Sequence, residues 1–463
     1  MLFGIRRINF VTKMKKIIWI TILLISLGFR EVSSQVKQWS LEDCINYAIA
    51  NNIDLQRQKL QTKSAEADLV KSKLDILPNL NMGSDANLQF GRSVNPVDYS
   101  ITFEQNFGNQ YYLNSSMNIF TGFVTMNTIA ANKFMVQAGL ESEKIARNRL
   151  IVDILGQFYQ ILYAKGLENA SKMQLDLSER QLFRITKMVE TGKEALSRKL
   201  EIESRVSADR LSYVIAKNTT SQAITTMKQM LQLQPGSDFD ILLPDLNNIL
   251  MPDITFNTDS VYALATEVLP RLKEITFELN AAKKQYAASK GYISPKLSVQ
   301  GQVYTGYYNV ISGNDVPQDP FTTQLKNNNS QYVNLSLSIP IFNNYSTGRN
   351  IKKAKLKRDD TALKLELEKN NLYSEIENAC LNYNRGKGEF EASVANLEFN
   401  KKSFNAVEKK FESGLVDVTD YTVAKTTLFS AQTESLRTKL QLIVRKLAIQ
   451  LYSTGEYENL IIN

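Results

Sequence analysis

Carboxylates are the side chains of this sequence most able to do chemistry, because the chain contains no histidine and only two cysteines. Histidine is the usual acid–base group near neutral pH and a common metal ligand, so its absence argues against most catalytic and zinc sites. We find no phosphate-binding glycine loop, no zinc spacing and no nucleophile elbow. The acidic pairs at 359–360 and 375/377 are typical of solvated helix faces. The sequence therefore predicts a protein that is not an enzyme and needs no cofactor or metal.

Two carboxylates have a more specific setting. Asp417 and Asp420 follow Gly414 closely, and a glycine at such a place can adopt the left-handed conformation that ends a helix. Negative charge in the first turn of the next helix is stabilised by the helix dipole. From the residues alone, Asp417 and Asp420 favour the start of a helix just after a turn.

The elements that position these carboxylates occur twice in the chain. Residues 41–90 align with 258–307, and residues 111–230 align with 333–452. The matches include the proline of Leu77-Pro78-Asn79-Leu80 with that of Ser294-Pro295-Lys296-Leu297. A copy of about 200 residues is far longer than the ~20–50 residues of solenoid or propeller repeats. The duplication predicts one architectural unit used twice around a pseudo-symmetric object.

Each copy is expected to start with a long helix followed by two strands. The helices cover 41–77 and 259–294, and Pro78 and Pro295 end them, since proline lacks the backbone donor and disfavours helix just before itself. Segments 92–110 and 311–330, rich in Asn, Gly, Pro and Ser, are expected to be exposed loops between the strands of each pair. Pro340 follows the last strand, so Pro78, Pro295 and Pro340 are predicted to mark helix–strand junctions.

The strands alternate between apolar and polar residues. Val333, Leu335, Leu337, Ile339 and Ile341 share one face, opposite Asn334, Ser336 and Ser338. Successive side chains of a strand point to opposite faces. This pattern fits either an ordinary sheet packed on a core or a transmembrane β-barrel with lipid outside and water inside. Four strands cannot close a barrel alone, so the barrel interpretation requires oligomerisation.

A very long helix follows the strands in each copy, over about 124–190 and 345–412. Some 67 residues reach roughly 100 Å, and heptad spacing in both helices predicts coiled-coil packing. Gly192 and Gly414 end these helices, and return helices capped by Ser197 and Thr419 run to about residues 233 and 452. Each copy therefore predicts a helical hairpin whose turn lies far from the strands. The fold class is mainly α with a β part.

The N-terminus has the order of a secretory signal, with basic residues, an apolar run from Ile17 to Leu27, and small residues at Ser33 and Ser34. Residues 1–34 carry six basic residues and one acidic residue, so without them the formal net charge falls from +8 to +3. That balance predicts no nucleic acid partner. The expected divisions are residues 1–34 as signal peptide, 35–233 as first repeat, 234–258 as linker, 259–454 as second repeat and 455–463 as tail.

This organisation resembles the TolC family of outer-membrane efflux proteins over essentially the whole mature chain. The residues that carry the resemblance are Gly414-Leu-Val-Asp-Val-Thr-Asp-Tyr-Thr-Val-Ala424 with Leu428, the opening segment Leu41–Asn52, and Leu77-Pro78-Asn79-Leu80. The resemblance implies a homotrimer whose strands close one 12-stranded barrel in outer membrane lipid, with a periplasmic α-barrel below it. It also implies a passive exit duct that works with a periplasmic adaptor and an inner-membrane pump of the RND or ABC type.

The resemblance also implies roles for the hairpin turns. Asp420 matches a family carboxylate that narrows the periplasmic entrance, with Asp417 beside it, whereas Val423 stands where the family often has a second Asp. Three copies of Asp420 would form a ring of like charge. Gly192, Gly414, Leu415 and Val416 would form the adaptor-docking tips; in the first copy Lys193-Glu194 replace Leu415-Val416, so the second hairpin is the better match.

Two other functions remain open at this point. The same fold could serve type I protein secretion rather than small-molecule efflux, and the pump that would decide is not part of this chain. A secreted structural or adhesive coiled-coil protein would explain the long helices and the leader. It would not explain why amphipathic strand pairs recur at both helix junctions.

Overall fold

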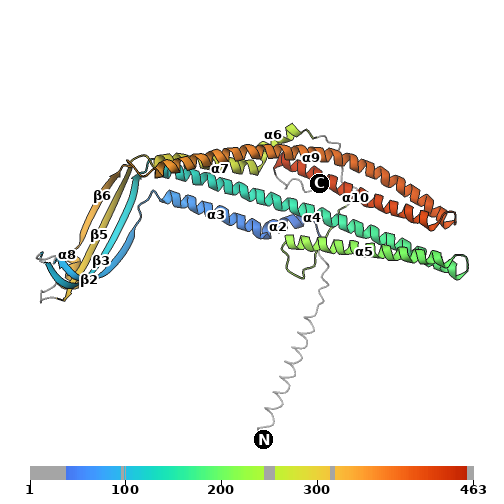
Figure 1. Cartoon of the computed structure of the whole chain (residues 1–463), viewed down its shortest axis with the longest axis horizontal. Helices are drawn as coiled ribbons and strands as arrows, with labels where there is room; N and C mark the ends of the chain where they lie inside the picture. Colours follow the sequence, from blue (N-terminus) through green and yellow to red (C-terminus); the bar gives the residue numbers. More distant parts are fainter. Residues whose placement is uncertain (1–37, 95–98, 100, 245–255, 313–318, 456–463) are drawn as a thin grey trace, which may run out of the picture.

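The computed structural model describes residues 38–94, 99, 101–244, 256–312 and 319–455. Within them the chain forms a long rod, with the strands at one end and the two helical turns at the other (Figure 1). Three predicted segments lie wholly or partly outside the described residues: the signal peptide at 1–34, residues 245–255 of the linker, and the tail from 456. No helix in the described ranges is long and apolar enough to cross a bilayer.

The helix that opens each copy is broken in two, so the prediction of single helices over 41–77 and 259–294 was wrong. The first pair is α2 (Leu41–Asn51) and α3 (Ile53–Leu74), and the second is α6 (Thr258–Val268) and α7 (Pro270–Gly291). Asn52 is extended at the first break, and its side chain caps α3 by accepting from Leu55 N. At the second break Pro270 occupies the first helical position and Leu269 is extended, as the ring of a following proline requires.

The two helical hairpins are confirmed. The long helices are α4 (Val124–Glu190) and α9 (Ser346–Glu412), each 67 residues, and the return helices are α5 (Leu196–Met230) and α10 (Val418–Thr454). The predicted caps Ser197 and Thr419 were wrong, because both lie inside the first helical turn. The capping positions are Ala195, which has no side-chain cap, and Asp417.

The strands form one antiparallel sheet in the order β2-β3-β5-β6. They are longer than expected, since β2 (Asn81–Val94), β3 (Ile101–Phe120) and β5 (Lys296–Ser312) extend into the predicted loops 92–110 and 311–330. The second loop also contains a short helix, α8 (Phe321–Asn327), before β6 (Ser330–Ser338). The Gln324 side chain of α8 accepts from Tyr308 N and donates to Tyr308 O, which satisfies the edge of β5 beyond the start of β6.

The apolar face of this sheet is bare. Along β6 and the residues after it, Val333, Leu335, Leu337 and Ile341 expose 80%, 63%, 63% and 95% of their surface. Neighbouring β2 has the same property, with Met82 82% exposed. Among the described elements, α8 alone touches this face, where Phe321 packs on Tyr307 at the far end of β5. The rest of the face is uncovered, so the alternative of an ordinary sheet packed on a core does not hold for the single chain.

Strands and helices lie side by side in the same order. α3 continues into β2, β3 into α4, α7 into β5 and β6 into α9, and the helices pack in the same row of α3, α4, α7 and α9. Further from the strands, α5 replaces α3 beside α4, and α10 replaces α7 between α4 and α9 (Figure 1). The row is therefore four helices wide at both levels, with β2 and β6 as the open edges of the sheet.

A large cluster of buried apolar residues lies at the middle of the rod. Leu41, Cys44 and Ile45 of α2 pack there against α4, α5 and α10. Two short strands, β1 (Gln38–Trp39) and β4 (Asp240–Ile241), pair in parallel beside this cluster. The sequence analysis did not foresee them. They tie the described start of the chain to the segment that joins the two copies.

Candidate functional site

The two hairpin turns have the same backbone. Gly192 and Gly414 both have φ of +71°, a conformation that a Cβ disfavours. In each turn the residue after the glycine donates to a carbonyl five residues back, Lys193 N to Met188 O at 2.8 Å and Leu415 N to Lys410 O at 2.9 Å. These bonds satisfy carbonyls that the helix end leaves open. At the second turn Leu415 is 75% exposed.

Asp417 is the N-cap of α10. Its side chain accepts from Asp420 N at 2.8 Å, which places both carboxylates in the first turn, where the dipole stabilises negative charge. Both side chains are exposed. Among the described residues, the Asp420 carboxylate has no hydrogen-bond or ion-pair partner and is free to face solvent or another molecule.

The two turns lie side by side and are joined by contacts between the hairpins. Arg184 of α4 donates from a guanidinium nitrogen to Glu412 O at 2.7 Å. A cleft of about 460 Å³ runs between them, lined by Arg184, Arg198, Glu194 and the second turn from Phe411 to Asp417. The predicted tip residues Gly414, Leu415 and Val416 line this cleft, whereas Gly192 does not.

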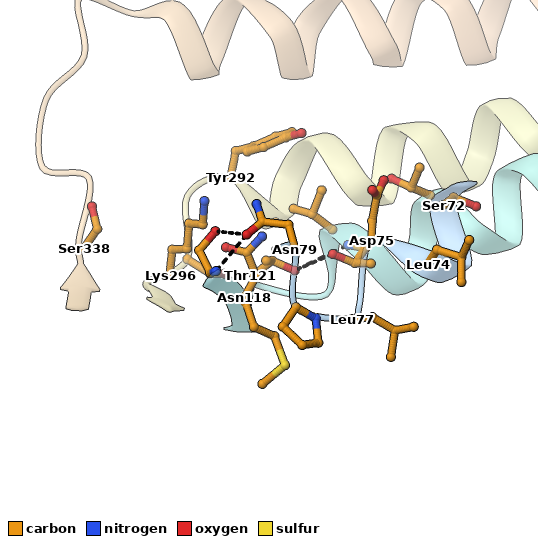
Figure 2. A pocket seen from close by; sticks show the side chains of 18 of the residues that line it. Ser72, Leu74, Asp75, Leu77, Asn79, Asn118, Thr121, Tyr292, Lys296 and Ser338 are labelled. Atoms are coloured by element: carbon orange, nitrogen blue, oxygen red, sulfur yellow. Dashed lines mark hydrogen bonds between the residues drawn. The ribbon is translucent and has the colours of Figure 1, made fainter. Parts of the chain in front are cut away.

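The helix–strand junctions form a second cleft, of about 660 Å³, at the other end of the rod. Pro78 and Pro340 line it, and Pro295 lies between two lining residues, Ser294 and Lys296. Asn79 ties β2 to β3 here, since its Oδ1 accepts from Ser116 N at 2.8 Å and Ser116 Oγ at 3.1 Å (Figure 2). The three predicted junction prolines are thus brought together at the level where all four helices become strands.

Backbone strain accompanies this change from helix to strand. Phe123 before α4 and Tyr345 before α9 both have positive φ, +63° and +62°, which is uncommon for residues with a Cβ. Gly122 also has φ of +62°, and any Cβ there would collide with the Gly291 carbonyl. The α7 and α4 ends approach each other so closely that only glycine fits.

A buried ion pair joins the two hairpins on the side of the turns that faces the strands. The sequence analysis missed it. Lys425 of α10 and Asp209 of α5 expose 3% and 6% of their side chains, with Lys425 Nζ 3.2 Å from Asp209 Oδ2. Lys425 Nζ also donates to Gln174 O and Ser178 Oγ of α4, both at 2.6 Å. Ser178 Oγ donates in turn to Asp209. Three helices from both copies therefore meet at one ammonium group.

The ammonium has a full set of acceptors, yet burial lowers the pKa of Lys425 to about 8, and Asp209 opposes that shift. Asp209 has a second cation, since Arg205 Nε lies 3.4 Å from its Oδ1. Arg205 also donates to Thr426 Oγ1 of α10 at 2.7 Å. At neutral pH the lysine remains charged, so this cluster holds α4, α5 and α10 in one register.

Comparison with known proteins shows which proteins this chain resembles. A family model described as outer membrane efflux protein matches residues 44–231 and 261–453, one stretch in each copy. An uncharacterized protein of Haemophilus influenzae is 21% identical, over 93% of this chain and 92% of its own length.

Solved structures share the fold. The CmeC outer membrane channel of Campylobacter jejuni superposes with a TM-score of 0.77 at 16% identity, covering 90% of this chain and 85% of CmeC. The outer membrane protein VceC of Vibrio cholerae gives 0.75 at 12% identity, covering 90% and 97%. The family match spans most of the chain and confirms the resemblance seen in the sequence. The chain belongs to the outer membrane efflux protein family.

Proposed function

We propose that three copies of this chain form the outer-membrane exit duct of a tripartite efflux system, which passes small molecules from an inner-membrane pump and a periplasmic adaptor to the exterior. The observation that carries the proposal is the bare apolar sheet face, on strands that each continue into a helix of the rod. Exposed apolar surface of this extent marks contact with a partner or a membrane.

The open edges support a closed assembly. β2 and β6 are unpaired at the two sides of the four-stranded sheet and run in opposite directions. An edge strand exposes a row of unpaired backbone groups, which lipid cannot satisfy. Pairing β6 of one copy with β2 of the next adds four strands per copy, and three copies supply the 12 strands that the family resemblance implies. The helices would extend from the barrel into the periplasm.

We assign the hairpin turns to the periplasmic entrance of this duct. Asp420 is exposed in the first turn of α10, so three copies around an axis would place three carboxylates at one level. Like charges brought together this way strengthen the local field and attract cations. Asp417 serves as cap and adds charge nearby.

We assign adaptor docking to the tips at Gly192, Gly414, Leu415 and Val416, with the second turn as the main contact. Leu415 is an aliphatic side chain at a water-exposed turn, beside a cleft that already holds arginine side chains. A small apolar anchor with a charged rim is the usual composition of a protein-binding surface.

The mass and the conductance of the purified protein test this function together. The full chain should be extracted by detergent from the outer-membrane fraction, sized by light scattering, and inserted into a planar bilayer. The proposal expects three times the chain mass and defined single-channel steps. A monomer that stays soluble without detergent and conducts nothing would refute the duct. It would favour the alternative of a secreted coiled-coil protein.

A further inference from the structure

The two copies of the repeat pack on each other inside the chain, and this internal contact provides a template for a contact between chains. α4 of the first copy packs on α7 and α10 of the second. In the alignment of the copies, α9 corresponds to α4, α3 to α7 and α5 to α10. α9 stands at one end of the row, and α3 and α5 stand at the other (Figure 1). In a ring of copies, α9 of one chain therefore meets α3 and α5 of the next.

One internal contact has an empty counterpart on the open side of α9. Gly166 of α4 lies against Leu436 of α10, and a Cβ at Gly166 would collide with that side chain. The aligned residues are Gly388 in α9 and Val214 in α5. Among the described residues, none outside the neighbouring turns lies within 4 Å of a Cβ placed at Gly388, and Val214 is 46% exposed. α4 and α10 lie between α5 and α9 of the same chain, so these two residues do not meet within one chain.

The open glycine has no packing reason inside the single chain. Glycine weakens the interior of a helix relative to alanine. Gly386 in the same helix has such a reason, because a Cβ there would collide with Arg445 of α10. Two residues turn a helix by about 200°, so Gly388 lies on the side opposite α10. α9 thus keeps space on its open side for a side chain that its own chain does not supply.

A stripe of exposed leucines continues along the side of α9 that carries Gly388. It consists of Leu356, Leu363, Leu367 and Leu381, which expose 58%, 66%, 60% and 61% of their surface. Their spacing keeps them on one helix face. The residues of α4 that align with them are all buried or half-buried. Apolar surface that is covered in one copy and bare in the other indicates a partner for the bare one.

A second template contact predicts which residue of the next chain meets this stripe. Phe134 of α4 stacks on Phe277 of α7, with the ring centroids 6.5 Å apart. The aligned residues are Leu356 of α9 and Leu60 of α3, and Leu60 is also bare in the single chain, at 63% exposure. The contact is therefore apolar on both sides in either copy, although the residues differ.

Charges differ together on the two sides of the contact. Lys352 and Lys353 of α9 align with two alanines of α4, whereas Glu66 and Asp68 of α3 align with a lysine and a glutamine of α7. All four charged side chains are exposed. At about 1.5 Å per residue, Lys352 lies roughly 9 Å from the start of α9, and Asp68 lies roughly 9 Å from the end of α3. Both of these helix ends adjoin the sheet, so opposite charges stand at one level where the two helices pack.

We propose that α9 of one copy packs against α3 and α5 of the next copy in the register of the internal contact, with Val214 seated on Gly388 and Leu60 beside Leu356. The inference rests on the proposed function, because β6 can pair with β2 of the next copy only where the attached helices also meet. The strand edges leave open which residues meet along the 67 residues of α9. The duplication supplies that register, and the glycine, the leucines and the paired charges agree with it.

Disulfide cross-linking of the full-length, detergent-purified protein tests the register. The test variant combines Gly388→Cys with Val214→Cys, because the template brings these positions close to the ~3.5–4.5 Å between Cβ atoms that a disulfide needs. The matched control combines Gly388→Cys with Leu200→Cys. Leu200 is 56% exposed on nearly the same side of α5, but it lies roughly 21 Å further along the helix. Each single variant controls for the two buried native thiols.

Oxidation should convert the test variant into covalent dimers and trimers that reductant reverses, and should leave the control and the single variants as single chains. A cross-link in the control instead would show a different register. No cross-link in a protein that is trimeric by mass would show that another partner covers this side of α9. Either result would overturn the proposal.

Filling the space at Gly388 provides a second measurement. Gly388→Leu should raise the dissociation constant of the trimer by about tenfold or more, because added atoms at a packed contact displace their neighbours. Gly156→Leu is the matched control, since Gly156 lies inside α4 and is also open. Equal effects of the two variants would contradict the seat for Val214. A wild type that is trimeric and conducts, without the expected cross-link, refutes only the register; a monomer that never conducts refutes the register and the proposed function together.

Discussion

Replacing Asp209 by asparagine removes the counter-ion of a lysine that has no exit to water. In the Asp209→Asn variant, Lys425 has only neutral acceptors, which are Gln174 O, Ser178 Oγ and the introduced amide oxygen. The lysine can avoid an unpaired buried charge by releasing its proton. The destabilisation caused by Asp209→Asn is then no larger than the free energy needed to deprotonate Lys425 in the wild-type fold.

The pKa of Lys425 sets this limit. With a folded pKa of about 8, deprotonation at pH 7 costs about 1.4 kcal/mol, at pH 6 about 3 kcal/mol, and at pH 9 almost nothing. The destabilisation by Asp209→Asn should therefore shrink by about 1.4 kcal/mol for each pH unit between 6 and 8. In the wild type the lysine pKa is lowered on folding, so its contribution to stability is constant below pH 8 and rises from there toward the unfolded value of 10.5.

Urea unfolding of the helical part, followed by far-ultraviolet circular dichroism at pH 6, 7 and 9, measures this dependence. Lys425→Met is the matched control, because Asp209 then retains Arg205 and Ser178 and no lysine remains to titrate. Its effect should be flat between pH 6 and 7 and should change only above pH 8, where the folded wild-type lysine loses its proton. A destabilisation by Asp209→Asn that is equally independent of pH would refute the idea that Lys425 is charged and buried at neutral pH.

Three further predictions concern the ends of the rod. Asp420→Ala should change conductance or cation selectivity in planar bilayers, whereas Asp417→Asn, which keeps a good capping side chain, should change them less; unaltered currents in the first variant would count against the constriction. Leu415→Asp should abolish adaptor pull-down, while Lys193→Asp at the equivalent place in the first turn should retain it, and full retention by both would remove the second turn as the contact. Gly122→Ala should lower the thermal stability of the junction by several kcal/mol, because its Cβ meets a backbone carbonyl that cannot move aside; a melting temperature within a degree of wild type would contradict this.

Much of the fold was predictable because its signals are periodic and occur twice. The alternation in β6 and the heptads of α4 and α9 each gave the correct element, and alignment of the two copies supported both assignments. The sequence analysis missed the breaks between α2 and α3 and between α6 and α7, because each break depends on a single residue. Pro270 separates α6 from α7 because a proline disfavours helix just before itself, but its apolar neighbours hid it in an otherwise continuous helical pattern.

The buried pair had a signal that the sequence analysis passed over. Lys425 continues the spacing of Val418 and Tyr421, both buried, and Asp209 continues that of Ile202 and Val206. A charged residue at a core position of one helix predicts an opposite charge at a core position of another. Which helices meet could not be predicted, because that depends on α10 lying beside α4 rather than on any spacing within one helix.

The buried ion pair shows that the two copies differ where their surroundings differ. Lys425 aligns with Glu203 and Asp209 aligns with Ala431, so the ion pair has no counterpart between the equivalent faces. α10 stands between α4 and α9, whereas α5 packs on α4 and contacts α10 through Asp209 and Arg205. The pair is therefore made once, by α10 of the second copy against α4 and α5 of the first, where three helices bury it. Duplication alone would have placed the same residues at both equivalent positions, so this asymmetry argues that the enclosed contact between the two hairpins, and not the repeated fold, selected the two charges.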